Sequence, residues 1–301
     1  MSFAVTRLDA LPTTDQHAAI SAVIHAATTH DGVPPLSEQF LRGLQKPEMQ
    51  HVHYVLSHAD TIVGLAAFDG STIELVVTPD ARRQGGGTAL TTAAGNYPVW
   101  AHGDLDVAQT FAQYQGREPQ RKFLVMSVSG PALNTAADYH LDAGLELLDL
   151  PAAYARFSTS NVDEQWLTAN NQAFSWHPEQ GGWDLDRLRQ ARNTAWYRLE
   201  DVLTLWEGEQ LLGFHWTKRH GDLRAGAMGE VYVVGLADVG RGRGLGGPLV
   251  SAGLQHLVAE GASTVFLYVE EANTAAVRAY DRLGFVPVER HVLYGNVHET
   301  S

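Results

Sequence analysis

Two stretches of this sequence decide its fold: Val76-Val-Thr-Pro-Asp-Ala-Arg-Arg-Gln-Gly-Gly-Gly-Thr88 and Leu236-Ala-Asp-Val-Gly-Arg-Gly-Arg-Gly-Leu-Gly-Gly-Pro248. Each follows an apolar, strand-like run and precedes an apolar-periodic run typical of a helix. Both contain Arg-x-x-Gly-x-Gly, beginning at Arg82 and Arg241, an offset of 241 − 82 = 159 residues. A pattern repeated between a strand and a helix indicates an internal duplication.

The remaining strand and helix patterns follow the same order in both halves, and 301 residues suit two domains of about 150 each. We therefore predict an α/β fold with mixed sheets, as two tandem domains over residues 1–152 and 153–301. In the first half we expect strands over 3–8, 51–57, 61–68, 72–78, 145–150 and 153–158, and helices over 15–29, 37–44, 88–94 and 132–142. In the second half we expect helices over 162–174, 248–260 and 274–283, and strands over 201–206, 210–218, 228–236, 263–269 and 285–289.

The composition narrows the possible partners. A net charge of −13 disfavours nucleic acid or an anionic membrane surface and suits a cationic acceptor. The absence of cysteine excludes disulfides and thiolate sites, and the His51/His53 and Asp104/Asp106 pairs lack a third ligand, so we predict no metal. The start of the chain does not resemble a signal peptide, and no apolar run is long enough to span a membrane. A cytoplasmic monomer is expected.

The glycine-rich turns have a chemical use. A strand, a glycine turn and a helix together present backbone N–H groups at the positive end of a helix dipole, where a pyrophosphate can bind. Glycine permits close backbone approach, and Arg241 and Arg243 add donors for anionic oxygens. The pattern lacks the Gly-Lys-Ser/Thr of a Walker A loop and the βαβ context of a Rossmann fingerprint. The alternative is a tight turn that binds nothing.

These residues resemble the acyl-CoA signature of the GNAT superfamily of N-acetyltransferases, Val-x-Pro-x-x-Arg-x-x-Gly-x-Gly. The stretch from Val77 to Gly87 matches it, and the stretch from Leu236 to Gly246 departs only at Leu236 and Asp238. The string from Asn273 to Phe285 resembles the closing helix of that superfamily. The resemblance implies two tandem GNAT domains with acetyl-CoA as co-substrate.

The resemblance also implies which residues contact acyl-CoA. In the second half they are Val234, Gly235, Leu236, Arg241, Gly242, Arg243, Gly244, Leu245, Gly246, Gly247, Asn273, Thr274, Ala275, Ala276, Val277 and Arg278. In the first half they are Leu75, Val76, Val77, Arg83, Gln84, Gly85, Gly86, Gly87 and Thr88.

Acetyl transfer to an amine needs a base for the ammonium proton, donors for the oxyanion and an acid for the departing thiolate. Glu230 lies on the strand before the turn, and period-two alternation predicts Tyr232 and Val234 on its face. We predict Glu230 as the base. Tyr280 resembles the thiolate-protonating tyrosine of the superfamily. The alternatives are a solvated strand end for Glu230 and a core aromatic for Tyr280.

The duplication provides an internal control. Subtracting 159 from Glu230 gives Ser71, and aligning Gly284 with Gly144 places His140 at the position of Tyr280. The first half thus has neither the base nor the acid. We expect it to bind CoA without catalysing the reaction.

The strings His177–Trp183, Glu230–Leu236 and Leu267–Glu270 resemble tandem GNAT members that acetylate the cysteinyl amine of a cysteine-glucosamine-inositol conjugate. That resemblance implies acceptor contacts drawn from both halves. Other small amines, such as an aminoglycoside, a polyamine or a peptide terminus, remain open as acceptors, and so does a non-catalytic acyl-CoA sensor. The implied acceptor contacts are Glu38, Glu179, Lys218, Glu230 and Tyr268.

Overall fold

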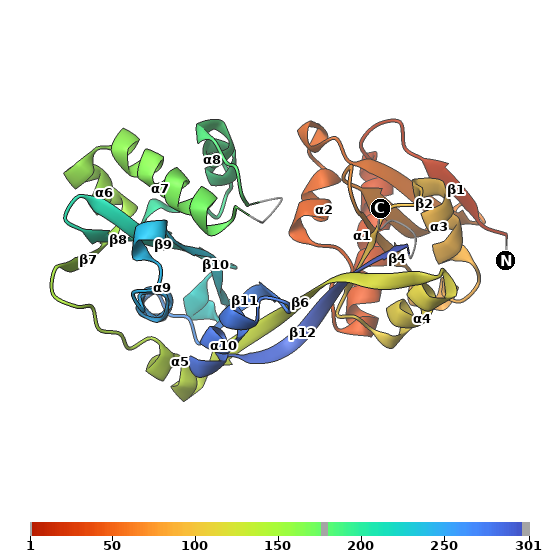
Figure 1. Cartoon of the computed structure of the whole chain (residues 1–301). Coiled ribbons are helices and arrows are strands. Elements are labelled where there is room, and N and C mark those ends of the chain that lie inside the picture. Colours follow the sequence, from red (N-terminus) through yellow and green to blue (C-terminus); the bar gives the residue numbers. More distant parts are fainter. Residues whose placement is uncertain (1, 176–179, 297–301) are drawn as a thin grey trace. The chain divides into compact units, whose positions relative to one another are not determined.

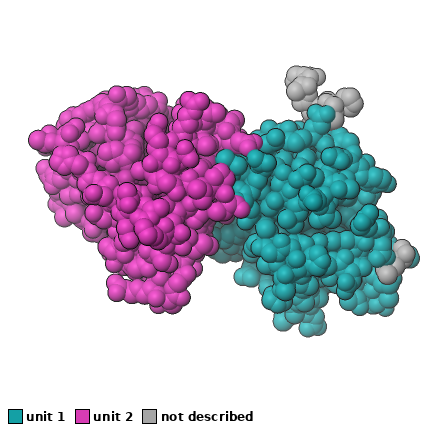
Figure 2. Space-filling view, turned by 90° about the horizontal axis from the view of Figure 1, so that it is seen from below, with its two compact units in different colours: residues 1–124, 289–301 teal, residues 125–288 magenta. Residues whose placement is uncertain are grey.

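The computed structural model describes residues 2–175 and 180–296. The chain forms two compact units: unit 1 comprises residues 1–124 and 289–301, and unit 2 residues 125–288 (Figure 2). The chain enters unit 2 within β6 (Arg117–Ser129) and returns to unit 1 within β12 (Val286–Asn296). These packing units differ from the predicted halves, because residues 125–152 pack with unit 2 and residues 289–296 with unit 1.

Unit 1 contains a sheet with the strand order β1-β2-β3-β4-β5-β12. Its pairs are antiparallel except for β4 and β5, which are parallel. The strands are β1 (Ala4–Arg7), β2 (Val52–His58), β3 (Thr61–Phe68), β4 (Ile73–Val77) and β5 (Val99–His102), and the helices are α1 (Thr14–Asp31), α2 (Glu38–Gly43), α3 (Gly86–Ala94) and α4 (Asp106–Tyr114).

Unit 2 contains a sheet with the strand order β6-β11-β10-β9-β8-β7, in which β10 and β11 are parallel. Helices α7 and α9 cover opposite faces of this sheet (Figure 1). The strands are β7 (Leu145–Asp149), β8 (Val202–Glu207), β9 (Gln210–Arg219), β10 (Gly229–Leu236) and β11 (Thr264–Glu270), and the helices are α5 (Gly130–Ala136), α6 (Leu150–Phe157), α7 (Thr159–Ala173), α8 (Leu185–Arg192), α9 (Gly246–Ala259) and α10 (Thr274–Arg282).

Helix α1 forms where the sequence predicts it. Thr13 and Gln16 make a capping box at its start, and Gly32 ends it in a left-handed conformation. The buried residues Ile20, Val23 and Ala27 recur at helical spacing and face the sheet of unit 1.

Helix α9 lies unusually close to its sheet. A Cβ atom at Gly253 would come within 2.1 Å of Nδ1 of the buried His215, so only glycine permits this approach. His215 Nδ1 lies 3.0 Å from the carbonyl oxygen of Leu249, and burial lowers the pKa of His215 to about 4. This ring is therefore a neutral part of the core.

Two predicted elements differ from the structure. The strand predicted over residues 153–158 is wrong, because this segment belongs to α6. Asp149 caps that helix by accepting a 2.9 Å hydrogen bond from the amide of Ala152, and Pro151 lies in its first turn. The helix predicted over residues 132–142 ends at Ala136, and helices α4 and α8 were not predicted. Among the described residues, no helix combines the length and apolar character needed to cross a bilayer.

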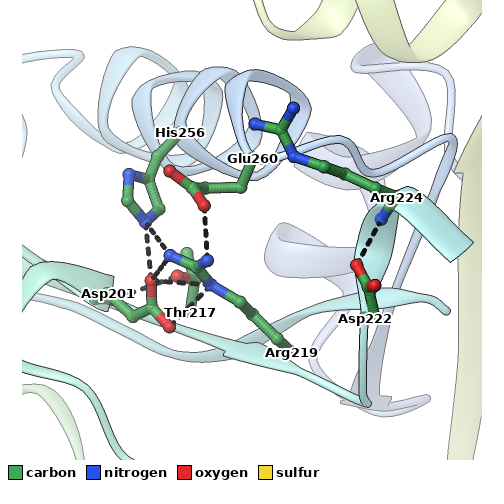
Figure 3. A network of polar contacts seen from close by, with 7 residues as sticks. All are labelled: Asp201, Thr217, Arg219, Asp222, Arg224, His256 and Glu260. Carbon is green, nitrogen blue, oxygen red and sulfur yellow. Dashed lines mark hydrogen bonds and ion pairs between the residues drawn. The ribbon is translucent and has the colours of Figure 1, made fainter.

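A charge network in unit 2 connects Asp201, directly before β8, with the end of β9 and the C-terminal end of α9 (Figure 3). The buried carboxylate of Asp201 accepts hydrogen bonds from the guanidinium of Arg219 at 2.5–3.0 Å and lies 2.7 Å from Nε2 of His256. Nη1 of Arg219 also donates to Glu260 at 2.5 Å. Burial by itself would raise the pKa of Asp201, but the bonds from His256 and Arg219 outweigh it and hold that pKa below its usual range.

Asp201→Asn should therefore destabilise unit 2 by about 3 kcal/mol at neutral pH, because it leaves Arg219 without its buried partner. Since the folded pKa of Asp201 lies below the unfolded value, the stabilisation is present above the unfolded pKa of about 4 and is lost as the pH falls. Denaturant unfolding from pH 7 to 3 measures this. The difference in the free energy of unfolding between wild type and Asp201→Asn should decrease on acidification. A difference that does not change with pH would contradict the role assigned to the Asp201 carboxylate.

Candidate active site

The two glycine turns have the same backbone conformation. Arg83 and Gly85 adopt φ values of 60° and 90°, and Gly242 and Gly244, 159 residues later, adopt 73° and 77°. A left-handed conformation strains most residues, so glycine is favoured at these positions. The duplicated sequence thus produces a duplicated turn.

Both turns leave a helix start open to a ligand. Neither Gly85, before α3, nor Leu245, before α9, provides a side-chain cap for its helix. A Cβ at Gly247 would meet nothing within 4 Å, so the space in front of α9 is open. Backbone N–H groups and the helix dipole at such a terminus can bind a phosphate.

The turn arginines in unit 2 are paired with carboxylates. Nη1 of Arg241 lies 2.8 Å from Asp238, and Arg243 forms two hydrogen bonds with Glu207 at 2.8 and 3.0 Å. Both arginines are partly exposed, and these ion pairs hold their side chains near the turn. The residues predicted at α10 form its first turns, where the side chain of Asn273 caps the amide of Ala276 at 3.2 Å.

Unit 1 has a pocket of about 810 Å³ beside its glycine turn. Strands β4 and β5 pair only at Ile73 and Val99, and the pocket opens where the strands separate. Gln84 does not line it and donates to the carbonyl of Asp80, and Gly86 is buried against Leu56. The predicted residues that line this pocket are Leu75, Val76, Val77, Arg83, Gly85, Gly87 and Thr88.

In unit 2, Glu230 lies where the corresponding parallel strands separate. The recorded pairing of β10 with β11 joins Gly229 to Val265 and Glu230 to Phe266. On the other side of β10, Glu230 lies opposite Lys218 of β9. The side chain of Glu230 is only 7% exposed, and its Oε2 lies 2.6 Å from Nε2 of His220.

A bulge changes the alternation just after Glu230. The pairing with β9 shifts between Val231 and Val233, so Tyr232 is an extra residue on β10. Beyond the bulge Val234 packs with Leu249 in the core on the α9 side. The prediction that Val234 shares the face of Glu230 is therefore wrong, because the bulge reverses the period-two pattern.

Aromatic rings surround the ammonium group next to Glu230. Nζ of the buried Lys218 lies 4.6 Å from the ring centre of Trp196 and 5.6 Å from that of Tyr232. Such contacts stabilise a cation away from water. On β11 the ring of Tyr268, 52% exposed, lies 5.7 Å from that of Phe266. The structure thus places Lys218 opposite Glu230 on β9, and Tyr268 next to Phe266, the partner of Glu230 on β11.

Tyr280 lies on α10, half-buried, with its ring 5.7 Å from that of the buried Phe285. Burial raises the pKa of Tyr280 to about 12. The hydroxyl therefore stays protonated at neutral pH and can act as a hydrogen-bond donor.

Comparison with known proteins identifies the family. The model of the Acetyltransferase (GNAT) family matches residues 164–285. The mycothiol acetyltransferase of Corynebacterium efficiens is 51% identical over 264 residues, which cover 88% of this chain and 87% of that protein. The mycothiol acetyltransferase of Corynebacterium diphtheriae is 49% identical, covering 91% and 92%. The chain belongs to the mycothiol acetyltransferase family.

Solved structures support the fold of this family member. A GCN5-related N-acetyltransferase from Sphaerobacter thermophilus has a TM-score of 0.67 and 20% identity, covering 97% of this chain and 94% of that chain. A tandem GNAT protein from the clavulanic acid biosynthesis pathway also has a TM-score of 0.67, with 18% identity and coverage of 97% and 98%. The predicted α/β fold with two tandem GNAT domains is confirmed.

The first half of this mycothiol acetyltransferase family member differs from the second at the reacting end. Ser71 lies in the turn between β3 and β4, where its amide and hydroxyl bond to Asp69. His140 is an exposed residue beyond the end of α5, whereas Tyr280 lies within α10. Strand β4 pairs with β3 in an unbroken register from Ile73 to Val77, without a bulge.

Unit 1 contains a buried carboxylate that was not predicted from the sequence. Glu74 of β4 accepts a 2.7 Å hydrogen bond from the amide of Ser37 and lies 3.0 Å from Nε2 of His102. Nδ1 of His102 in turn lies 2.5 Å from Nδ1 of His291 on β12. A charged residue within the apolar strand Ile73–Val77 is the signal that could have revealed this group.

The predicted acceptor residues are distributed along the chain. Glu38 is exposed at the start of α2 in unit 1, and its contact with the acceptor remains a prediction. Glu179 and the start of the string His177–Trp183 lie outside the described residues. Among the residues that the structure does describe, no group of three or more histidine or acidic side chains is arranged to hold a metal.

Proposed function

We propose that this chain transfers the acetyl group of acetyl-CoA to the cysteinyl amine of a cysteine-glucosamine-inositol conjugate, the last step of mycothiol biosynthesis. The observation that carries the proposal is the buried Glu230 carboxylate where β10 and β11 separate, in a chain about half identical to mycothiol acetyltransferases. Turnover of acetyl-CoA against a panel of amines that includes this conjugate tests it. A preference for an aminoglycoside, a polyamine or a peptide would contradict it.

The acetyl-CoA of the reaction binds, in this proposal, along β10 and at the start of α9. Beyond Glu230 the edge of β10 turns away from β11, so its amide groups can pair with the amides of the pantetheine arm. The pyrophosphate then lies at the glycine turn, next to the N–H groups of α9. The predicted contacts 234–236 and 241–247 belong to this strand and turn, and the predicted contacts 273–278 at α10 are a further part of the proposed site.

Glu230 acts as the base, directly or through a water molecule. A free α-amine titrates near pH 7.7, so much of the acceptor is an ammonium ion at neutral pH and one proton must leave before attack. The freed amine attacks the thioester carbonyl, and the resulting oxyanion needs a donor. We assign that role to the backbone at the Tyr232 bulge, because the unbulged β4 of the first half has no counterpart.

Tyr280 serves the leaving group. When the tetrahedral intermediate collapses, the carbon–sulfur bond breaks and the electron pair goes to the CoA thiolate. The hydroxyl of Tyr280 keeps its proton at neutral pH, so it can donate a hydrogen bond to that sulfur as charge develops. The acceptor is held by Lys218, Glu230 and Tyr268, with Glu38 and Glu179 as further predicted contacts.

Glu230→Gln should lower kcat/KM by about 10²–10⁴ and weaken the acid limb of the pH profile, because a general base typically contributes that factor. Affinity for acetyl-CoA should stay the same, since the carboxylate lies beyond the predicted CoA contacts. Steady-state kinetics and calorimetry measure the two quantities. Ser71→Ala in the first half is the matched control and should have wild-type kinetics. Full activity of Glu230→Gln with an unchanged pH profile would show that another residue is the base.

Tyr280→Phe should lower kcat and leave the acid limb unchanged, because the hydroxyl serves the thiolate and not the amine. The ring contact with Phe285 is retained in this variant, so folding should be preserved. Pre-steady-state measurement of thiol release isolates the affected step. A variant with normal thiol release would show that Tyr280 is only a packing residue.

Both halves should bind CoA. Calorimetry with CoA on the intact chain should give a stoichiometry near two when both sites start empty. Gly85→Asp and Gly244→Asp should each remove one site, because a carboxylate at the helix start repels phosphate. Asparagine tolerates the same left-handed backbone without the charge, so Gly85→Asn and Gly244→Asn are matched controls. A wild-type stoichiometry near one, with no CoA released on denaturation, would rule out the first site.

A further inference from the structure

His220 forms a contact with Glu230 that the mechanism above does not use. This histidine directly follows β9, and its amide donates a 3.0 Å hydrogen bond to the carbonyl of Met228, which fixes the backbone beside β10. Its ring centre lies 5.0 Å from that of Phe266 on β11. Backbone and ring contacts together hold Nε2 of His220 2.6 Å from Oε2 of Glu230.

The two side chains differ in their access to solvent. The side chain of Glu230 is 7% exposed, whereas that of His220 is 33% exposed. The imidazole of His220 therefore lies on the solvent side of a carboxylate that is itself almost fully buried. Titratable groups that the structure describes on this face of the sheet include Lys218, opposite Glu230 on β9, Tyr232 on β10, whose ring centre lies 5.6 Å from Nζ of Lys218, and Tyr268 on β11. In the turn after His220, the carboxylate of Asp222 accepts a hydrogen bond from the amide of Arg224.

The hydrogen bond between His220 and Glu230 determines which ring nitrogen can take up a further proton. A nitrogen and an oxygen 2.6 Å apart share a proton, so Nε2–H of His220 donates to the Glu230 carboxylate and Nδ1 keeps its lone pair. The lone pair on Nδ1 is then the site on His220 that can accept a proton.

We propose that His220 is a positioning and proton-relay residue for Glu230: it fixes the carboxylate through Nε2–H and removes the acceptor's proton to solvent through Nδ1. The inference rests on the proposed role of Glu230 as the base. Glu230 takes one proton from the ammonium group, and that proton passes through water to Nδ1 of His220. The resulting imidazolium releases it to solvent, and the carboxylate is restored for the next turnover.

Two substitutions separate fixing from relay. His220→Gln retains an N–H donor for Oε2 of Glu230 but cannot carry a proton, whereas His220→Ala removes both and leaves space for free imidazole. His220→Gln should lower kcat by about 10- to 100-fold, less than the loss of the base itself, with KM for acetyl-CoA unchanged. The acid limb of its kcat profile should move to lower pH, because only a carboxylate then has to be ionised. Added imidazole should partly restore His220→Ala.

The measurements are made on the full-length chain, with Glu230→Gln in the same series. His140→Gln, which changes an exposed histidine elsewhere in unit 2, is the matched control and should have wild-type kinetics. A His220→Gln variant with wild-type kcat and an unmoved profile, or a His220→Ala variant that imidazole does not restore, would overturn the relay. If Glu230→Gln is fully active, the proposed base itself fails; if it is impaired while His220→Gln is normal, only the relay fails.

Discussion

Parallel strands β10 and β11 run side by side for two residue pairs and then separate, with Glu230 in the last pair. A strand edge that loses its neighbour exposes amide groups that another extended molecule can occupy. The carboxylate of Glu230 lies where this exposed edge begins. In the sheet register Glu230 has Lys218 of β9 on one side and Phe266 of β11 on the other. Unit 1 repeats the arrangement, since β4 and β5 part after Ile73 and Val99 and a pocket lies between them.

The two halves share the turn that suits a phosphate and differ where chemistry would occur. Backbone torsions at Arg83 and Gly85 match those at Gly242 and Gly244, so the turn has kept its conformation after duplication. The bulge at Tyr232 has no equivalent in β4. Strand β4 instead carries Glu74, whose carboxylate contacts Ser37 and His102. The contact with Ser37 connects the start of α2 to the sheet. The proposed division between CoA binding and catalysis therefore rests on differences within one shared fold.

Local sequence signals predicted much of this architecture. The glycine turns and the regular apolar spacing of Ile20, Val23 and Ala27 were sufficient for the strand–turn–helix units and for α1. The family resemblance supplied the roles proposed for Glu230 and Tyr280. The bulge at Tyr232 could not be predicted, because one inserted residue leaves no mark in a single sequence and yet reverses which side chains share a face.

Contacts that depend on strand register and helix packing were also beyond prediction. The approach of His220 to Glu230 depends on the register of β9 and β10, and the network of Asp201 with Arg219 depends on how α9 packs. The predicted halves follow the repeat in the sequence, whereas the packing units do not. The two divisions differ because β6 and β12 each pass between units, and no local sequence pattern indicates where a strand will pair.

The sheet of unit 1 can be completed only after β12, which is synthesised late, has become available. Its residue His291 pairs with His102 of β5, a separation of 189 residues, and Tyr294 lines the pocket of unit 1 while bonding to Asp104. At 5–20 residues per second, a ribosome needs about 10–40 s to supply this partner after β5 emerges. During that interval the edge of β5 is open to strands of other chains. The first half of this chain to be made is thus completed only after the second.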